Sequence, residues 1–261
     1  MSAPALELHG VTVRFGGIVA ADAVSFTVAP GETVGLIGPN GAGKTTILDV
    51  VAGARRPAEG RVSLYGDQVT TRSVVQRARA GVARTFQQLS LFEDMTVRDH
   101  VVLGCLAART AAGDAPGYWR GRASVERALL ADDSPLGPVA LLRRLRLEPL
   151  ADEPASAQSV GTVRMIDLAR ALASRPRLLL LDEPVSGLNE AEAQHVAEVL
   201  VSLHADHDLA MLVVEHNLEF ARLLSDRIVA LDFGKVIADG APADVLGSTA
   251  LREAYFGAAA A

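Results

Sequence analysis

One stretch of consecutive residues has the types and spacing of a loop that binds phosphate groups. It fits the pattern G-x-x-x-x-G-K-[ST] and consists of Gly38, Pro39, Asn40, Gly41, Ala42, Gly43, Lys44, Thr45 and Thr46. Glycines let successive backbone N–H groups approach a phosphate without a Cβ in the way, and a helix beginning near Gly43 would direct its positive end at the same anion. Lys44 would supply a mobile positive charge, and the Thr45 hydroxyl suits Mg²⁺. The stretch therefore predicts a site for nucleotide phosphates.

The segments on either side of this loop provide the context that the pattern requires. Residues 33–37 form an apolar run that predicts a buried strand, and residues 47–51 predict a helix. Strand, glycine-rich loop and helix in this order are needed for the loop to present its N–H groups. A glycine-rich turn without a ligand is the alternative, since a chain of this length matches the pattern by chance in roughly one case per hundred.

Two adjacent carboxylates supply the second chemical signal. The apolar run 178–181 leads directly into Asp182 and Glu183. Downstream of a phosphate loop, such a pair can hold the shell of a Mg²⁺ ion and polarise a water for in-line attack. An acidic pair after a strand is more often an edge or a helix cap, so only its combination with the loop favours nucleotide hydrolysis.

Composition narrows the class of protein. The chain has 261 residues, a formal net charge of −6 and a single cysteine, Cys105. We expect no general nucleic-acid-binding surface from this charge and no internal disulfide. Cys105 is interpreted as a core residue. No apolar run is long enough to span a bilayer, and the N-terminus has no secretion-signal pattern, so we expect a cytosolic protein.

The remaining elements follow from periodicity. Residues 5–15 and 24–29 alternate in polarity and predict an antiparallel sheet before the phosphate loop, and residues 60–66 and 81–86 predict further strands. We interpret Arg72, Arg77 and Arg79, between those strands, as a solvated helical face. Residues 96–147 have helical spacing, which is interrupted at 113–122 by an expected exposed loop or hairpin tip.

The second half of the chain alternates helices with wholly apolar strands. Helices are expected over 163–174 and 190–204, and buried strands over 177–181 and 209–214. Two more strands are expected over 227–231 and 234–240, followed by a short helix that ends near Tyr255 and Phe256. This alternation predicts an α/β sheet that is covered on both faces.

Taken in order, the motifs resemble those of the ATP-binding subunits of ABC transporters over essentially the full length. The matching pieces are Phe15 as the adenine-stacking aromatic, Gly38 to Thr46 as Walker A, Gln87 as the Q-loop glutamine, Gln158 to Thr162 at the signature position, Leu178 to Glu183 as Walker B, Ser186 to Asn189 as the D-loop and His216 as the switch histidine. Taken separately, Phe15 could be a core residue, Gln87 an exposed turn residue and His216 a surface histidine.

The resemblance implies an α/β fold with a P-loop NTPase core of the ABC ATPase type, an antiparallel β subdomain and a helical subdomain. We expect a single domain over 1–261. Within it, residues 1–86 and 160–240 would form the catalytic core with the β subdomain, about 87–159 the helical subdomain, and 241–261 a C-terminal helical tail.

The same resemblance implies the roles of the site residues. Glu183 would be the catalytic base, His216 would contact the γ-phosphate, and Gln87 would contact the Mg²⁺ and the water. Thr45 would ligate the Mg²⁺, and Asp182 would hold its coordination shell. ATP and Mg²⁺ are the implied cofactors.

The signature departs from the family pattern. Leu-Ser-Gly-Gly-Gln is usual, whereas residues 158–162 read Gln-Ser-Val-Gly-Thr. Ser159 and Gly161 are retained and would bind the γ-phosphate of a second subunit's ATP. Asn189 stands where the D-loop usually has aspartate. We therefore expect an intact ATP-binding face and an altered face toward a partner.

Within the family, the chain is most similar to branched-chain amino acid uptake ATPases. The segments that support this include 14–17, 83–87, 214–217, 232–235 and the ending 253–257. Permease subunits, a second ATP-binding subunit and, indirectly, a solute-binding protein are implied as partners, with a peripheral position at the cytoplasmic face of the membrane. The alternatives are a urea or amide importer, a soluble ABC ATPase outside transport, and a regulatory subunit with impaired hydrolysis.

Overall fold

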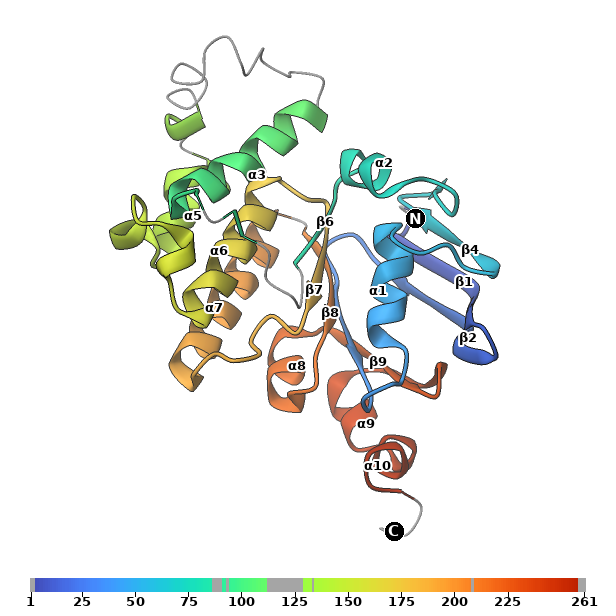
Figure 1. Ribbon diagram of the computed structural model, residues 1–261. Coiled ribbons are helices and arrows are strands. Elements are labelled where there is room, and N and C mark those ends of the chain that lie inside the picture. The colour runs from blue at the N-terminus through green and yellow to red at the C-terminus, as the bar shows by residue number, and fades with distance from the viewer. Residues whose placement is uncertain are drawn as a thin grey trace.

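The computed structural model describes residues 3–85, 91–92, 94–111, 129–132, 134–207 and 209–257. In these residues the chain forms two sheets with helices around them (Figure 1). The antiparallel sheet has the order β2-β1-β4-β5, and the larger sheet has the order β10-β9-β3-β8-β7-β6. Gln87 and the predicted loop at 113–122 lie outside the described residues.

The antiparallel sheet includes the two strands that the sequence predicts before the phosphate loop, the second of which begins earlier than expected, and two short strands that follow the loop. Its strands are β1 (Leu6–Phe15), β2 (Ile18–Val28), β4 (Glu59–Leu64) and β5 (Asp67–Gln68). Leu6 pairs with Val28 of β2 on one side and with Leu64 of β4 on the other, so β1 lies between these two strands in the sheet. Burial alternates at the start of β1 (Leu6, Leu8) and at the end of β2 (Val24, Phe26, Val28), which is the pattern of a sheet with one face on the core.

The larger sheet carries the loops of the candidate site. Its strands are β3 (Thr33–Ile37), β6 (Val82–Arg84), β7 (Leu178–Asp182), β8 (Ala210–Val214), β9 (Arg227–Asp232) and β10 (Lys235–Gly240). All the pairs from β6 to β9 are parallel, and β10 is antiparallel to β9. Strands β3, β7 and β8 are buried throughout, which confirms the prediction that both faces are covered.

Helices cover both faces of this sheet. They are α1 (Lys44–Ala52), α2 (Val74–Arg79), α3 (Val97–Ala111), α5 (Pro138–Arg144), α6 (Val160–Ala173), α7 (Glu190–His207), α8 (Leu218–Leu224), α9 (Pro242–Leu246) and α10 (Thr249–Phe256), with the 3₁₀ helices η2 (Glu148–Leu150) and η3 (Ala155–Ala157). Helix α1 packs with the antiparallel sheet on one face, and α3, α5, α6 and α7 pack on the other (Figure 1).

One contact shows how closely α3 and α6 pack. A Cβ on Gly104 of α3 would lie 2.2 Å from the Arg170 carbonyl oxygen of α6, so only glycine allows this approach. Cys105, beside it, is buried, as the sequence predicts. No helix among the described residues is both long and apolar enough to cross a membrane.

The interpretation of Arg77 as part of a solvated face is wrong. Its side chain is 1% exposed, and its guanidinium donates to the carbonyl oxygens of Val50 and Val51 at 2.6 and 2.8 Å. These carbonyls lie in the last turn of α1, where the Val50 carbonyl oxygen also accepts the Gly53 N–H. Burial lowers the pKa of Arg77 to about 10. Arg77 therefore caps the helix that follows the phosphate loop.

Candidate nucleotide-binding and catalytic site

The phosphate loop connects the end of β3 to the start of α1, as its pattern predicts. Gly38 and Gly43 have φ angles of 149° and 101°. A Cβ at Gly38 would lie 2.1 Å from the Leu231 carbonyl oxygen, and one at Gly43 would lie 2.2 Å from the Ala20 carbonyl oxygen. Both glycines are therefore required where neighbouring backbone segments press against the loop.

The Lys44 side chain lies inside the loop. It is 7% exposed, and its Nζ donates to the carbonyl oxygens of Gly38 and Pro39 at 2.6 and 2.9 Å. Burial lowers the pKa of Lys44, while the charges of Glu183 and Asp182 act in the opposite direction. The negative charges of both carboxylates therefore favour the charged form of Lys44. Thr45, at the start of α1, is exposed, so its hydroxyl is open to a ligand.

Asp182 ends β7 and is almost fully buried. Its side chain is 1% exposed, and Oδ2 accepts a hydrogen bond from Arg84 Nη2 at 2.9 Å. Burial raises the pKa of Asp182, and the adjacent Arg84 guanidinium opposes that rise. Within the described part of the chain, its other oxygen, Oδ1, is buried and has no hydrogen-bond partner. This oxygen can therefore accept a hydrogen bond from a ligand or from hydration water of a metal ion.

Arg84 links three elements at this point, a role that the sequence analysis does not identify. Its Nη1 donates to Asp49 Oδ1 of α1 at 2.6 Å, and its Nη2 donates to Asp182 of β7. The side chain itself belongs to β6 and is only 9% exposed. The neighbouring Thr85 Oγ1 accepts a hydrogen bond from the Asp182 N–H at 3.3 Å. Because Arg84 bonds α1, it connects the end of β7 to the helix that follows the phosphate loop.

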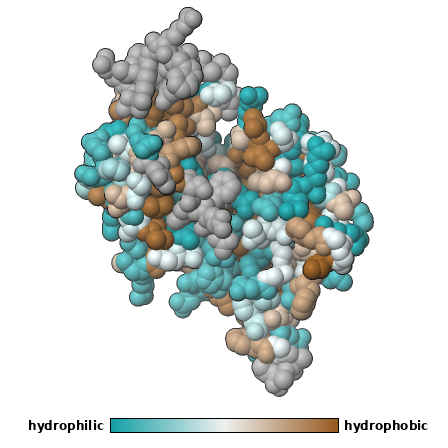
Figure 2. Space-filling view, viewed as in Figure 1, coloured by the Kyte–Doolittle hydropathy of each residue, from teal (hydrophilic) through white to brown (hydrophobic). Residues whose placement is uncertain are grey.

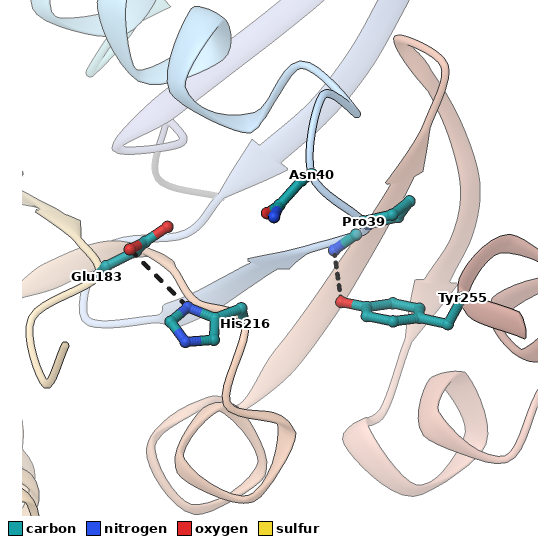
Figure 3. Close-up of a pocket in the computed structure, with 6 residues that line it drawn as sticks. Pro39, Asn40, Glu183, His216 and Tyr255 are labelled. Atoms are coloured by element: carbon teal, nitrogen blue, oxygen red, sulfur yellow. Dashed lines mark hydrogen bonds and ion pairs between the residues drawn. The ribbon is translucent and has the colours of Figure 1, made fainter.

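Glu183 and His216 lie in neighbouring loops, which follow β7 and β8, and their side chains face each other (Figure 3). Glu183 Oε2 lies 3.8 Å from His216 Nδ1, as the dashed line in Figure 3 shows. Glu183 has a φ of 50°, a left-handed conformation that non-glycine residues rarely adopt and that often marks functional sites. The Glu183 side chain is 19% exposed and that of His216 is 55% exposed. The carboxylate is thus sheltered, while the imidazole is open to a ligand.

Glu215 lies beneath this pair and is fully buried. Its Oε1 accepts a hydrogen bond from the Val185 N–H at 3.5 Å, and its Oε2 accepts from the N–H groups of His216 and Asn217 at 3.1 and 3.2 Å. Burial raises the pKa of Glu215, and these donors oppose the rise. The Glu215 carboxylate thus joins the loop after Glu183 to the loop that carries His216. No sequence pattern predicts this role of Glu215.

A cavity of about 500 Å³ opens between these loops. Figure 3 shows Glu183 and His216 on one side of it and Asn40, Pro39 and Tyr255 on the other. Of the residues predicted for the site, the structure therefore brings Gly38, Pro39 and Asn40 of the phosphate loop together with Glu183 and His216 around one space. Tyr255, from α10, is a lining residue that the sequence analysis does not assign to the site.

Phe15 lies at the end of β1 and is 42% exposed. The Arg55 guanidinium carbon is 4.1 Å from the centre of its ring, which is a cation–π contact. Phe15 is thus an accessible aromatic and not a core residue. Its stacking on an adenine stays a prediction.

The residues predicted to serve a second subunit lie elsewhere on the chain. Ser159 caps α6, and its Oγ accepts a hydrogen bond from the Thr162 N–H at 3.2 Å. Gly161 is buried, and a Cβ there would lie 3.2 Å from both carboxylate oxygens of Glu192. Glu192 and Asn189 bond each other's backbone N–H groups at 2.9 Å, so the Asn189 side chain caps α7. None of these residues is a described lining residue of the cavity.

Comparison with known families agrees with this arrangement. The sequence model of the family described as ABC transporter matches residues 21–186, which include the phosphate loop, Asp182 and Glu183. The chain belongs to the ABC transporter family. It is an ABC ATPase, and the predictions of this family and of its α/β fold are confirmed.

Relatives of this ABC ATPase match it along nearly the whole chain. The high-affinity branched-chain amino acid transport ATP-binding proteins BraF of Pseudomonas aeruginosa and LivG of Escherichia coli K12 are each 33% identical, over 99% of this chain and 100% of theirs. The phosphonates import ATP-binding protein PhnC of Rhodopseudomonas palustris is 34% identical, over 96% of this chain and 89% of its own.

Solved structures give the same result. A nucleotide-free ATP-binding cassette from an ABC transporter is 26% identical with a TM-score of 0.81, and it is matched over 98% of this chain and 100% of its own. The ADP conformation of the ATP-binding cassette MJ1267 is 27% identical with a TM-score of 0.79, over 98% and 99% of the two chains. ATP-binding subunits of ABC transporters are therefore the class to which the chain belongs.

The ABC ATPase site also fits a magnesium ion. The donor set that a hard cation prefers consists of oxygens, and the site offers the open Thr45 hydroxyl and the unpartnered Oδ1 of Asp182. Bound there, Mg²⁺ would neutralise charge that develops on the phosphates. Thr45 would ligate it directly and Asp182 would orient its water shell. Gln87, the third predicted metal contact, lies outside the described residues.

Proposed function

We propose that this ABC ATPase powers the import of branched-chain amino acids through a membrane permease. The observation that carries the proposal is the match to BraF and LivG over the full length of both chains. The identity with the phosphonate importer subunit is 34% against 33%, but that match covers less of both chains. The substrate is a small polar solute under either assignment, and transport assays distinguish them.

In this proposal the cavity residues act on an ATP that is held by the phosphate loop. Lys44 neutralises the phosphates, and the N–H groups at the start of α1 bind them. Glu183 positions and deprotonates the attacking water, and His216, 3.8 Å away, contacts the γ-phosphate. The sheltered position of Glu183 beside an open imidazole supports these roles. Phe15 stacks on the adenine, and Gln87 contacts the Mg²⁺ and the water.

A second ATP-binding subunit completes the site in the proposed mechanism. Ser159 and Gly161 serve the partner's γ-phosphate, and Asn189 lies at the same interface. ATP then bridges two subunits, so that its binding favours the closed dimer and hydrolysis removes the bridge. The departures at Gln158 and Thr162 lead us to propose two unequal composite sites in a heterodimer, with slower hydrolysis at the partner's phosphate loop.

We place the permease contact on the helical subdomain, about residues 87–159, between the core segments 1–86 and 160–240. Of the segment 89–92, the structure describes Leu91, which packs on the core, and Phe92, which is 57% exposed. Figure 2 shows apolar side chains gathered around α2, which belongs to the core segment 1–86 and contacts α3 of the helical subdomain. We propose that this apolar surface meets the permease at the cytoplasmic side of the membrane.

The proposed substrate is tested by reconstitution. The chain is purified together with candidate permease subunits from the same organism, placed in vesicles, and supplied with a candidate solute-binding protein. ATP-dependent uptake of labelled leucine, isoleucine and valine is compared with uptake of urea, an amide and a phosphonate. Uptake of the branched-chain amino acids alone supports the proposal. Uptake of another solute with no uptake of leucine would refute it and leave the ATPase assignment intact.

A further inference from the structure

The last described helix of the chain reaches the nucleotide cavity. Tyr255 projects from the end of α10, and its hydroxyl accepts a hydrogen bond from the Gly38 N–H at 3.2 Å. In Figure 3 its ring lies under Pro39, across the cavity from Glu183 and His216. The contact joins residues that are separated by 217 positions in the sequence.

Gly38 is the point at which the phosphate loop leaves β3, and it is held on two sides. A Cβ at Gly38 would lie 2.1 Å from the Leu231 carbonyl oxygen of β9, so that side is closed by backbone. Its N–H is bound by the Tyr255 hydroxyl. A buried N–H that loses its acceptor is costly, so the Tyr255 hydroxyl favours this one position of the loop entrance.

The ring of Tyr255 also fixes α10 against elements of the site. It packs on an apolar cluster that includes Ile37 of β3, Ala221 of α8 and Leu251 of α10. Helix α8 begins directly after the loop that carries His216. Burial raises the pKa of Tyr255, so the phenol stays protonated while its oxygen accepts the Gly38 N–H. Helix α10 therefore packs on a cluster to which the strand before the phosphate loop and the helix after His216 both contribute.

We propose that Tyr255 is a positioning residue of the nucleotide site, whose hydroxyl holds Gly38 and keeps the phosphate loop in its ATP-binding conformation. Docking of α10 on the core then controls the affinity for ATP. This proposal rests on the assignment of residues 38–46 as the phosphate-binding loop. It makes the C-terminal helix a part of the ATP site.

The direct test is Tyr255→Phe in the full chain, because this variant removes the hydroxyl and keeps the ring. We expect the Kd and the KM for ATP, measured with Mg²⁺ present, to rise by about two- to tenfold, with kcat changed by less than about twofold. The matched control is Tyr65→Phe, which removes a phenolic hydrogen bond to the Arg177 carbonyl oxygen at 2.7 Å. It should lower thermal stability without changing the Kd for ATP.

A double variant tests the role of α10. Leu251 is 3% exposed, so Leu251→Ala loosens the helix from the core. It should raise the Kd for ATP in the wild-type background and have little further effect in the Tyr255→Phe background. Equal effects in both backgrounds, or an unchanged Kd in Tyr255→Phe, would overturn the proposal. Absence of ATP binding in wild type and in Tyr65→Phe alike would overturn the phosphate-loop assignment as well.

Discussion

Replacement of Arg84 by methionine should destabilise the fold, because the negative charge of Asp182 then lacks its partner. The side chains of Arg84 and Asp182 are 9% and 1% exposed, so the variant leaves the Asp182 carboxylate buried without its ion-pair partner and with almost no access to water. Removing one partner of a buried ion pair costs about 3–5 kcal/mol. Asp49, the other partner, is 30% exposed and is solvated in the variant, so its contribution is small. We expect the free energy of unfolding to fall by about 3 kcal/mol at neutral pH.

The loss should depend on pH in a defined direction. The pKa of Asp182 is already raised by burial, and Arg84 is the group that holds it down. Without Arg84 the folded-state pKa rises further, so the cost of the buried carboxylate is full above that pKa and disappears as Asp182 takes up a proton. The stability difference between wild type and variant should therefore shrink as the pH falls from neutral through that raised pKa.

Urea denaturation at several pH values measures both effects. The matched control is Arg227→Met, which also breaks two ion pairs, but with Glu32 and Asp239 that are 18% and 36% exposed. Its stability loss should be smaller and should not shrink over this pH range. The double variant Arg84→Met with Asp182→Asn should recover most of the stability. A loss that is independent of pH, or no recovery in the double variant, would refute this reasoning.

Three further variants test other parts of the site. Gly38→Ala places a Cβ 2.1 Å from the Leu231 carbonyl oxygen. The free energy of unfolding, measured by urea denaturation, should fall by at least about 2 kcal/mol, and ATP binding should weaken. Wild-type stability and binding would contradict the loop geometry. Glu215→Gln turns an amide N–H₂ toward backbone N–H donors, so the free energy of unfolding should fall by about 1–3 kcal/mol and ATP turnover should slow. Unchanged turnover would show that Glu215 does not position His216. Gln158→Leu with Thr162→Gln should raise the turnover of the two-subunit complex, and no change would count against unequal sites.

Much of the fold could be predicted because its signals are local. The run 33–37 is apolar except for Thr33 and forms β3 at the predicted residues, since a strand buried on both faces needs no polar alternation. The antiparallel pairing of β1 and β2 follows from period-two alternation. The phosphate loop is visible because its glycines and lysine are adjacent in the sequence.

The interactions that sequence reasoning missed join distant segments. Arg84 acts through Asp49 and Asp182, which lie 35 and 98 positions away. Arg77 looked like a surface residue because its partners are backbone carbonyls of another helix, which leave no trace in the sequence pattern. Tyr255 likewise acts through a backbone N–H. Tertiary contacts of this kind decide burial and charge state, and periodicity does not report them.

The most direct test of the central claim compares wild type with Glu183→Gln. The claim is that Glu183 is the base in an ATP site that a second subunit completes. We predict that the variant loses ATP turnover by about 10²- to 10⁴-fold and still binds ATP. It should also form an ATP-dependent dimer in size-exclusion chromatography with light scattering. Wild-type turnover together with no ATP-dependent association would contradict the account.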